Sequence, residues 1–191
     1  MEQKLKNLTY IVLIGFLVNI FLTAGLYFKT FNTSNNEGTS NNGSTKTYDV
    51  SKMTKVNVDG AKALFDSKEI QVLYIGRSDC SVCIDTVPVL NEVQKELNYV
   101  TNYLDLNSVS NWKTELKPLA DLMTVKTKLT TTVRNEEGES EKVTLDDTMG
   151  NIFIKYGFTP TIVIIKDGKM VDGFIGYKDH DTVKKLVEKY M

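Results

Sequence analysis

The sequence of 191 residues contains only two cysteines and a single histidine. Two cysteines form either one bridge or one active dithiol, so they exclude the multi-disulfide framework of small secreted domains. A zinc site needs about four ligands, and two cysteines with the distant His180 do not supply them. An excess of charge is also absent, since 23 Lys and Arg balance 24 Asp and Glu. That balance gives no reason to expect nucleic acid as a partner.

Charged residues are missing from residues 7–28, which are predominantly apolar. A helix of this length spans roughly 30 Å at about 1.5 Å per residue, which is the thickness of a bilayer core. Lys4 and Lys6 precede the run, and Lys29 closes it. We therefore predict that residues 1–29 are a transmembrane helix that anchors a single-pass protein in the cell membrane, with its C-terminal domain extracytoplasmic. A cleaved signal peptide, which would leave a secreted protein, is the alternative.

Apolar residues are scarce in residues 30–47, which consist mainly of Asn, Ser, Thr and Gly. This composition is typical of a flexible linker. From residue 48 to residue 191, apolar residues recur with the spacings of strands and helices. We therefore predict one globular domain over residues 48–191, which is an ordinary length for a single domain.

The globular part alternates between helical and strand patterns. Strands are expected within the β-branched and aromatic runs, at residues 70–75, 100–106, 158–165 and 170–175, with a hairpin of 129–133 against 141–145. Helices are expected at residues 59–68, 80–97, 110–123, 147–156 and 179–190. The helix between the first two strands predicts a parallel βαβ unit, and Asp167-Gly168 predicts a tight antiparallel hairpin. The expected fold is α/β, with a mixed sheet flanked by helices.

The two cysteines form the sequence Cys80-Ser81-Val82-Cys83, after a predicted strand and at the start of a predicted helix. A C-x-x-C sequence in that setting is typical of a redox motif. Backbone N–H groups and the positive end of the helix dipole favour the thiolate of Cys80, and Cys83 is placed to resolve a mixed disulfide. This chemistry needs no metal and no organic cofactor. A structural disulfide is the alternative, although such a small closed loop stabilises little.

Residues 48–191 resemble a thioredoxin-fold domain. The resemblance covers residues 72–83 with the following helix, and then residues 156–169. It implies that Pro160 is a cis-proline beside the redox cysteines and that Thr159 hydrogen-bonds the substrate backbone. Before this proline, an insertion at about residues 107–147 is longer than in a minimal thioredoxin, and it is a candidate for selecting partners.

The same resemblance reveals departures around the cysteines. The usual aromatic residue before the first cysteine is Asp79 here, and a buried acid that serves proton transfer in the family is replaced by Tyr74. The dipeptide Ser81-Val82 is neither the Gly-Pro of thioredoxins nor the Pro-His of strong disulfide oxidases. The direction of the redox reaction therefore does not follow from the resemblance.

A narrower resemblance rests on residues 74–80 and on Lys155-Tyr156-Gly157. These segments are similar to bacteriocin transport accessory proteins, which are thioredoxin-like proteins of Gram-positive bacteria. That family is associated with the export or disulfide formation of secreted peptides.

Together these features predict an extracytoplasmic thiol–disulfide oxidoreductase, with Cys80 and Cys83 catalytic and Thr159 and Pro160 binding substrate. The expected partners are exported proteins or peptides that contain cysteines. An oxidising location favours disulfide formation or isomerisation, unless a redox partner in the membrane supplies electrons. Two alternatives remain open. One is a non-catalytic thioredoxin-like binding module of a secretion assembly, and the other is a membrane-tethered disulfide reductase.

Overall fold

The computed structural model describes residues 47–134 and 137–191. The predicted membrane anchor, residues 1–29, and nearly all of the predicted linker, residues 30–47, lie outside the described residues. Across the described ranges, none of the helices combines the length and the apolar content that crossing a bilayer requires.

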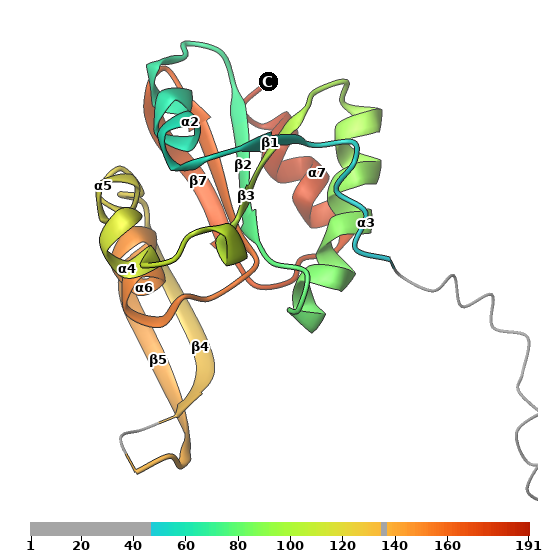
Figure 1. Cartoon of the computed structure of the whole chain (residues 1–191). Helices are drawn as coiled ribbons and strands as arrows, with labels where there is room; N and C mark the ends of the chain where they lie inside the picture. The colour runs from blue at the N-terminus through green and yellow to red at the C-terminus, as the bar shows by residue number, and fades with distance from the viewer. Residues whose placement is uncertain (1–46, 135–136) are drawn as a thin grey trace, which may run out of the picture. The chain divides into compact units, whose positions relative to one another are not determined.

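A mixed sheet of five strands forms the centre of the domain, in the order β1-β3-β2-β6-β7 (Figure 1). Its strands are β1 Thr54–Val56, β2 Gln71–Gly76, β3 Thr101–Asp105, β6 Thr161–Lys166 and β7 Lys169–Ile175. Strands β1, β3 and β2 are parallel, while β6 runs antiparallel to β2 and β7 runs antiparallel to β6. The predicted parallel βαβ unit and the C-terminal hairpin are both confirmed. The sequence does not predict strand β1, because this strand is short and has no apolar run. It lies at the edge of the sheet, where backbone pairing with β3 holds it.

The hairpin between β6 and β7 turns through Asp167 and Gly168, as predicted. Both residues have positive φ, 52° and 74° respectively. A two-residue hairpin turn of type I′ requires positive φ at both central positions, which Asp and Gly tolerate better than most residues. The local sequence is therefore sufficient to set this turn.

Helices cover both faces of the sheet (Figure 1). They are α2 Val58–Ala63, α3 Ser81–Glu96, α4 Trp112–Glu115, α5 Lys117–Ala120, α6 Met149–Tyr156 and α7 His180–Glu188, with 3-10 turns at Leu64–Asp66 and Leu106–Ser108. Two helix predictions need correction. The helix predicted at residues 59–68 is the short helix α2, which Asn57 caps, followed by the 3-10 turn at Leu64–Asp66. The single helix predicted at 110–123 is two short helices, and Pro118 lies in the first turn of the second, where its missing N–H costs no helical hydrogen bond.

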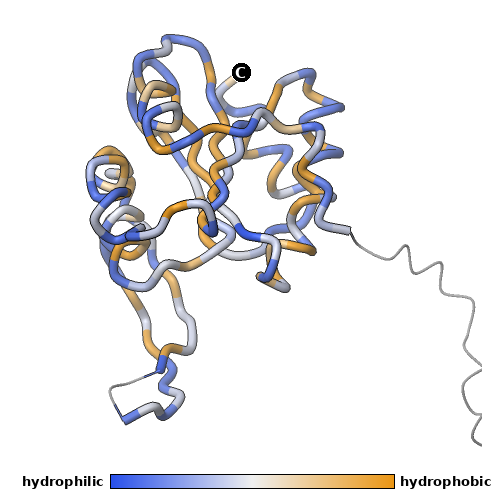
Figure 2. The backbone as a smooth tube through the Cα atoms, in the orientation of Figure 1, coloured by the Kyte–Doolittle hydropathy of each residue, from blue (hydrophilic) through white to orange (hydrophobic). Residues whose placement is uncertain are grey.

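The sheet separates two hydrophobic clusters. In β2, Leu73 and Ile75 face the cluster that includes helices α2, α5 and α6, while Val72 and Tyr74 face the cluster built with α3 and α7. Because both faces of β2 are covered, its residues from Val72 to Gly76 are all buried and the strand reads as a nearly continuous apolar run. Figure 2 shows the same pattern, with hydrophobic residues concentrated along the central strands and the inner helix faces.

The segment that the sequence predicts to be an insertion contains the two short helices and a separate two-stranded hairpin. Its strands are β4 Lys126–Arg134 and β5 Ser140–Thr148, with Leu129 opposite Leu145, so the predicted hairpin is confirmed and extends further than expected. The hairpin projects away from the five-stranded sheet, and α6 follows it directly (Figure 1). Gly157 ends α6 in the left-handed conformation, with φ of 65°.

Candidate active site

The two cysteines lie where β2 gives way to α3, which is the predicted strand–turn–helix setting. Cys80 is the N-cap residue of α3, and its Sγ accepts a hydrogen bond from the backbone N–H of Cys83 at 3.2 Å. Both residues are free thiols. Cys80 is partly exposed, whereas Cys83 has no exposed surface. The arrangement therefore presents one thiol to solvent at a helix N-terminus and keeps the other inside.

Thr159 and Pro160 lie beside these cysteines although they are far away in sequence. The Cys80 thiol donates a hydrogen bond to the carbonyl oxygen of Thr159 at 3.3 Å. The Thr159–Pro160 peptide bond is cis, as the thioredoxin resemblance implies. The Pro160 carbonyl accepts the N–H of Gly176 at 2.8 Å, which connects this loop to the end of β7. The fold thus brings the four predicted site residues into one place.

The charges nearest the motif neutralise each other. The sequence leaves open whether Arg77 or Asp79 has the greater influence on Cys80. In the structure Arg77 Nε lies 3.5 Å from Asp79 Oδ1, and the Asn107 amide donates to the same oxygen at 3.1 Å. The Asn107 hydrogen bond and the Arg77 charge together lower the pKa of the Asp79 carboxyl. Asp79 is therefore held by its own partners and does not act on Cys80 as an isolated charge.

Cys83 is held in its protonated form by its surroundings. Burial raises the pKa of the Cys83 thiol, and its hydrogen bond with Cys80 raises it further. The backbone of Arg77 and, to a smaller extent, the Thr159 and Tyr74 side chains act in the opposite direction but leave the net shift of the Cys83 pKa upward. Resolution of a mixed disulfide by Cys83 therefore requires a route for its proton to leave a buried site.

Three tyrosine hydroxyls form a connected cluster next to Cys83. Tyr74 donates to the Tyr48 hydroxyl at 3.2 Å, and Tyr48 donates to the Tyr103 hydroxyl at 2.8 Å. Sequence reasoning singled out Tyr74 but missed Tyr48 and Tyr103. A signal for Tyr103 exists, because it occupies a predicted strand beside the one that carries Tyr74. Tyr48 lies outside the regular elements, and nothing local in the sequence marks it.

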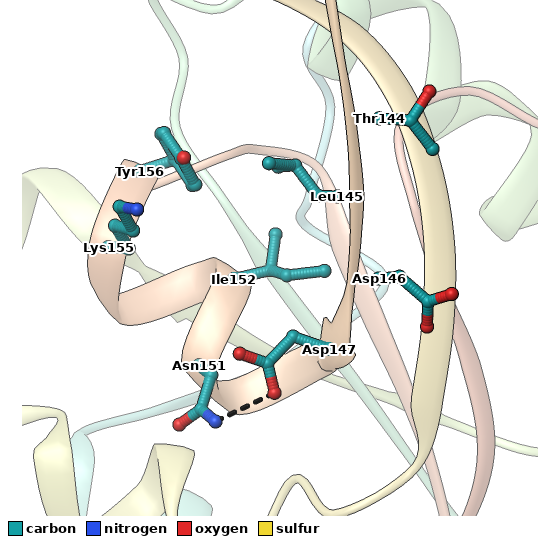
Figure 3. Close-up of a pocket in the computed structure, with 8 residues that line it drawn as sticks. All are labelled: Thr144, Leu145, Asp146, Asp147, Asn151, Ile152, Lys155 and Tyr156. Carbon is teal, nitrogen blue, oxygen red and sulfur yellow. Dashed lines mark hydrogen bonds between the residues drawn. The ribbon is translucent and has the colours of Figure 1, made fainter.

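Other features of the described residues do not join this site. In 47–134 and 137–191, no group of three or more His, Cys, Asp or Glu side chains is arranged to hold a metal ion. His180 lies at the start of α7, where it contacts Glu96 and Asp181 at 3.1 Å each. A pocket beside β5 and α6, where Asn151 donates to Asp147 at 2.8 Å, contains neither cysteine (Figure 3).

Comparison with known proteins gives distant structural likenesses. No family model matches the sequence. A thioredoxin of Plasmodium falciparum aligns over 73% of this chain and 100% of its own, with 16% identity and a TM-score of 0.45. The oxidised mitochondrial thioredoxin 3 of Saccharomyces cerevisiae aligns over 73% of this chain and 96% of its own, with 16% identity and a TM-score of 0.45. The strand order, the mixed pairing and the helices on both faces fit a thioredoxin-like α/β fold.

The raised pKa of Cys83 leads to a prediction for the Cys80→Ser variant. Alkylation of Cys83 by iodoacetamide should reach its midpoint above the ordinary thiol value of about 8.5, because burial, the largest cause of the shift, does not depend on Cys80. The measurement is the alkylation rate against pH, followed by mass spectrometry. The same variant in denaturant is the control and should titrate at the ordinary value. An equal midpoint in the folded and denatured protein would contradict the prediction.

The raised pKa of Cys83 also determines how its contribution to folding stability changes with pH. Because the folded protein keeps the Cys83 proton to a higher pH than the unfolded chain, the contribution of Cys83 to stability is fully present below the unfolded pKa. It is lost as the pH rises through the folded pKa.

Proposed function

We propose that this protein is an extracytoplasmic thiol–disulfide oxidoreductase that acts on cysteines of exported proteins or peptides. The observation that carries the proposal is the pairing of a partly exposed Cys80 at the start of α3 with a buried Cys83 one turn later. The Cys80 sulfur lies within hydrogen-bonding distance of both the Cys83 N–H and the Thr159 carbonyl. A helix N-terminus stabilises negative charge on a thiolate, which is the reactive form.

In the reductive direction, the Cys80 thiolate attacks one sulfur of a client disulfide. A bond forms between Cys80 Sγ and that sulfur, the client disulfide breaks, and the other client sulfur leaves as a thiolate. Cys83 then loses its proton and attacks Cys80 Sγ, which releases the second client thiolate and forms the Cys80–Cys83 disulfide. Two electrons pass from the protein dithiol to the client. The same steps in reverse oxidise a client dithiol.

Thr159 and Pro160 are proposed to align the client chain. In the dithiol form, the Thr159 carbonyl accepts a hydrogen bond from the Cys80 thiol. When Cys80 becomes a thiolate it has no proton to donate, and the Thr159 carbonyl becomes available to a backbone N–H of the client. Binding of the client backbone would thus be coupled to the reactive state of Cys80.

The proposed location and clients rest on the sequence. The apolar run in residues 1–29 and the polar residues 30–47 support a domain tethered outside the membrane. The similarity of residues 74–80 to bacteriocin transport accessory proteins supports secreted peptides as clients. An oxidising exterior favours disulfide formation or isomerisation. A membrane redox partner would be required for sustained reduction.

The test uses two assays on the purified protein, reduction of insulin by added dithiol and refolding of reduced ribonuclease. We expect wild type to accelerate at least one of them, and the reduction potential of the Cys80–Cys83 pair to identify the direction. The control is the double variant Cys80→Ser with Cys83→Ser, which preserves side-chain size and removes both thiols. Equal rates for wild type and control in both assays would refute the enzymatic function and favour a binding module.

A further inference from the structure

We propose that the hydroxyl groups of Tyr74, Tyr48 and Tyr103 form a proton relay between the buried Cys83 thiol and the Asp105 carboxylate at the domain surface. This inference rests on the proposed function, because a relay is needed only if Cys83 cycles between thiol and disulfide. Tyr74 is the tyrosine that interacts with the Cys83 thiol, and we assign it as the residue that exchanges a proton with that sulfur. Tyr48, Tyr103 and Asp105 act through Tyr74.

The strand register places the first and third tyrosines side by side. Tyr74 in β2 pairs directly with Tyr103 in β3, and because directly paired residues lie on the same side of the pleated sheet, both rings project from the same face. The rings stack with centroids 5.3 Å apart and an angle of 22° between their planes. Tyr48 meets Tyr103 edge-on, with centroids 6.1 Å apart. In this position the Tyr48 hydroxyl bridges the other two hydroxyls.

Gly76 creates the space that the Tyr74 ring occupies. Residues 74 and 76 project from the same face of β2, and a Cβ atom on Gly76 would overlap with the Tyr74 hydroxyl. Tyr74 is fully buried, its hydroxyl donates to Tyr48, and the nearby Cys83 side chain contributes to the raised pKa of Tyr74. The shape of the strand therefore places the Tyr74 hydroxyl in the buried region that also holds Cys83.

Asp105 provides the outer end. It closes β3, its side chain is 23% exposed, and it pairs with Lys55 at 3.3 Å. Asp105 follows Tyr103 by two residues on the same strand and contributes to the raised pKa of Tyr103, and the Asp105 Oδ1 also accepts the backbone N–H of Asn107 at 3.1 Å. A carboxylate at the surface can accept a proton from Tyr103 and release it to water. The two hydrogen bonds that link the tyrosine hydroxyls thus lie between the buried Cys83 and a carboxylate at the surface.

The path is needed because Cys83 has no exposed surface and cannot give its proton directly to water. Burial also raises the pKa of Tyr74 and of Tyr103, so neither hydroxyl ionises on its own. Each tyrosine instead accepts one proton as it donates another, and no tyrosinate has to accumulate. Neutral hydroxyls suit a relay better than they suit a stationary base.

The proton count balances in each step. The Cys83 S–H proton moves to the Tyr74 oxygen, the Tyr74 proton moves to Tyr48, the Tyr48 proton moves to Tyr103, and the Tyr103 proton moves to Asp105. All three tyrosines end neutral, with their hydrogen bonds reversed, and Tyr74 now donates to the Cys83 thiolate. Asp105 loses the proton to water while the thiolate attacks Cys80. When the Cys80–Cys83 disulfide is opened by a client, the same path returns a proton to Cys83.

The test follows the reaction of the reduced protein with dithiobisnitrobenzoate by stopped flow. Attack by Cys80 releases the first coloured thiolate, and attack by Cys83 on the mixed disulfide releases the second. We expect Tyr74→Phe to slow the second release by roughly 10²-fold, the lower end of what proton transfer contributes, and to leave the first unchanged. Tyr48→Phe and Asp105→Asn should also slow the second release, each by a smaller factor than Tyr74→Phe, because these residues lie further from the sulfur. Tyr99→Phe removes a hydroxyl from the same hydrophobic cluster outside the relay and serves as the control.

A solvent isotope measurement separates proton transfer from a structural role. In wild type, the rate constant of the second thiolate release should fall non-linearly with the deuterium fraction of the solvent, because several protons move together. In Tyr48→Phe that dependence should become linear. If Tyr74→Phe does not fold, the partly exposed Tyr48 carries the test.

The outcomes distinguish the relay from the enzyme. If Tyr74→Phe and Tyr48→Phe both release the first and the second thiolate at the wild-type rates, the relay is wrong and the proposed oxidoreductase function is unaffected. A first release that does not depend on Cys80 overturns the oxidoreductase itself.

Discussion

Replacement of Cys80 by Ser is expected to abolish thiol–disulfide exchange, with a loss of roughly 10³-fold or more, as when a catalytic nucleophile is removed. A serine hydroxyl stays protonated at neutral pH and is a poor nucleophile toward sulfur. Cys83 cannot substitute, because it is buried and its pKa is raised. The measurement is insulin reduction or ribonuclease refolding, with the denaturation midpoint confirming that the variant folds.

The Cys83→Ser variant is the matched comparison, because it removes the other thiol by the same change. We expect it to react through Cys80 and then to stop at the mixed disulfide, since the resolving sulfur is gone. With dithiobisnitrobenzoate it should release the first thiolate and keep the second bound, which mass spectrometry detects. With exported client proteins it should accumulate covalent complexes that added dithiol dissolves. Activity retained by Cys80→Ser, or rapid release of both thiolates by Cys83→Ser, would show that the roles are wrongly assigned.

Replacement of Gly150 by Ala is expected to have the largest effect on stability among single methyl additions, a loss of about 3 kcal/mol from overpacking. Gly150 lies in the first turn of α6, and its N–H donates to the Met123 carbonyl at 2.9 Å. An added Cβ would overlap with the carbonyl oxygen of Ala120. That neighbour is backbone, so it cannot rotate away, and α6 must move off α5. The gain in helix propensity, about 1 kcal/mol, is smaller than this cost.

Urea denaturation measures the effect of Gly150→Ala. The control is Lys155→Ala, an exposed position on the same helix, where we expect a change within about 0.5 kcal/mol. A Gly150→Ala protein as stable as the control would mean that the α5–α6 contact yields easily to a methyl group.

The sequence predicts the framework of this domain better than its details. The apolar run of β2, the Asp167-Gly168 turn and the register of Leu129 against Leu145 follow from patterns within a few residues. The errors arise where local signals compete. A continuous helix at 110–123 agrees with apolar spacing, but the structure has two short helices there, and Pro118 lies in the first turn of the second. Strand β1 is set by its pairing with β3, and its own side chains do not reveal it.

Some of the candidate site can be anticipated from the sequence. The spacing of Cys80 and Cys83, the preceding strand and the following helix place a dithiol at a helix N-terminus. The thioredoxin resemblance adds Thr159 and Pro160 as residues expected at the same place. The partners that adjust the site are different, because Asn107 on Asp79 and the Tyr48 hydroxyl on Tyr74 come from distant segments. No spacing rule connects those segments to the cysteines.

The sequence by itself therefore determined the reactive pair, because a C-x-x-C turn and a helix start depend on neighbouring residues alone. Tertiary structure decided what surrounds that pair. Antiparallel pairing of β6 with β2 carries Thr159 to Cys80, and parallel pairing of β3 with β2 sets Tyr103 against Tyr74. Sheet register fixes such neighbours across long stretches of chain, and the burial of Cys83 surrounds it with side chains that no local pattern in the sequence identifies.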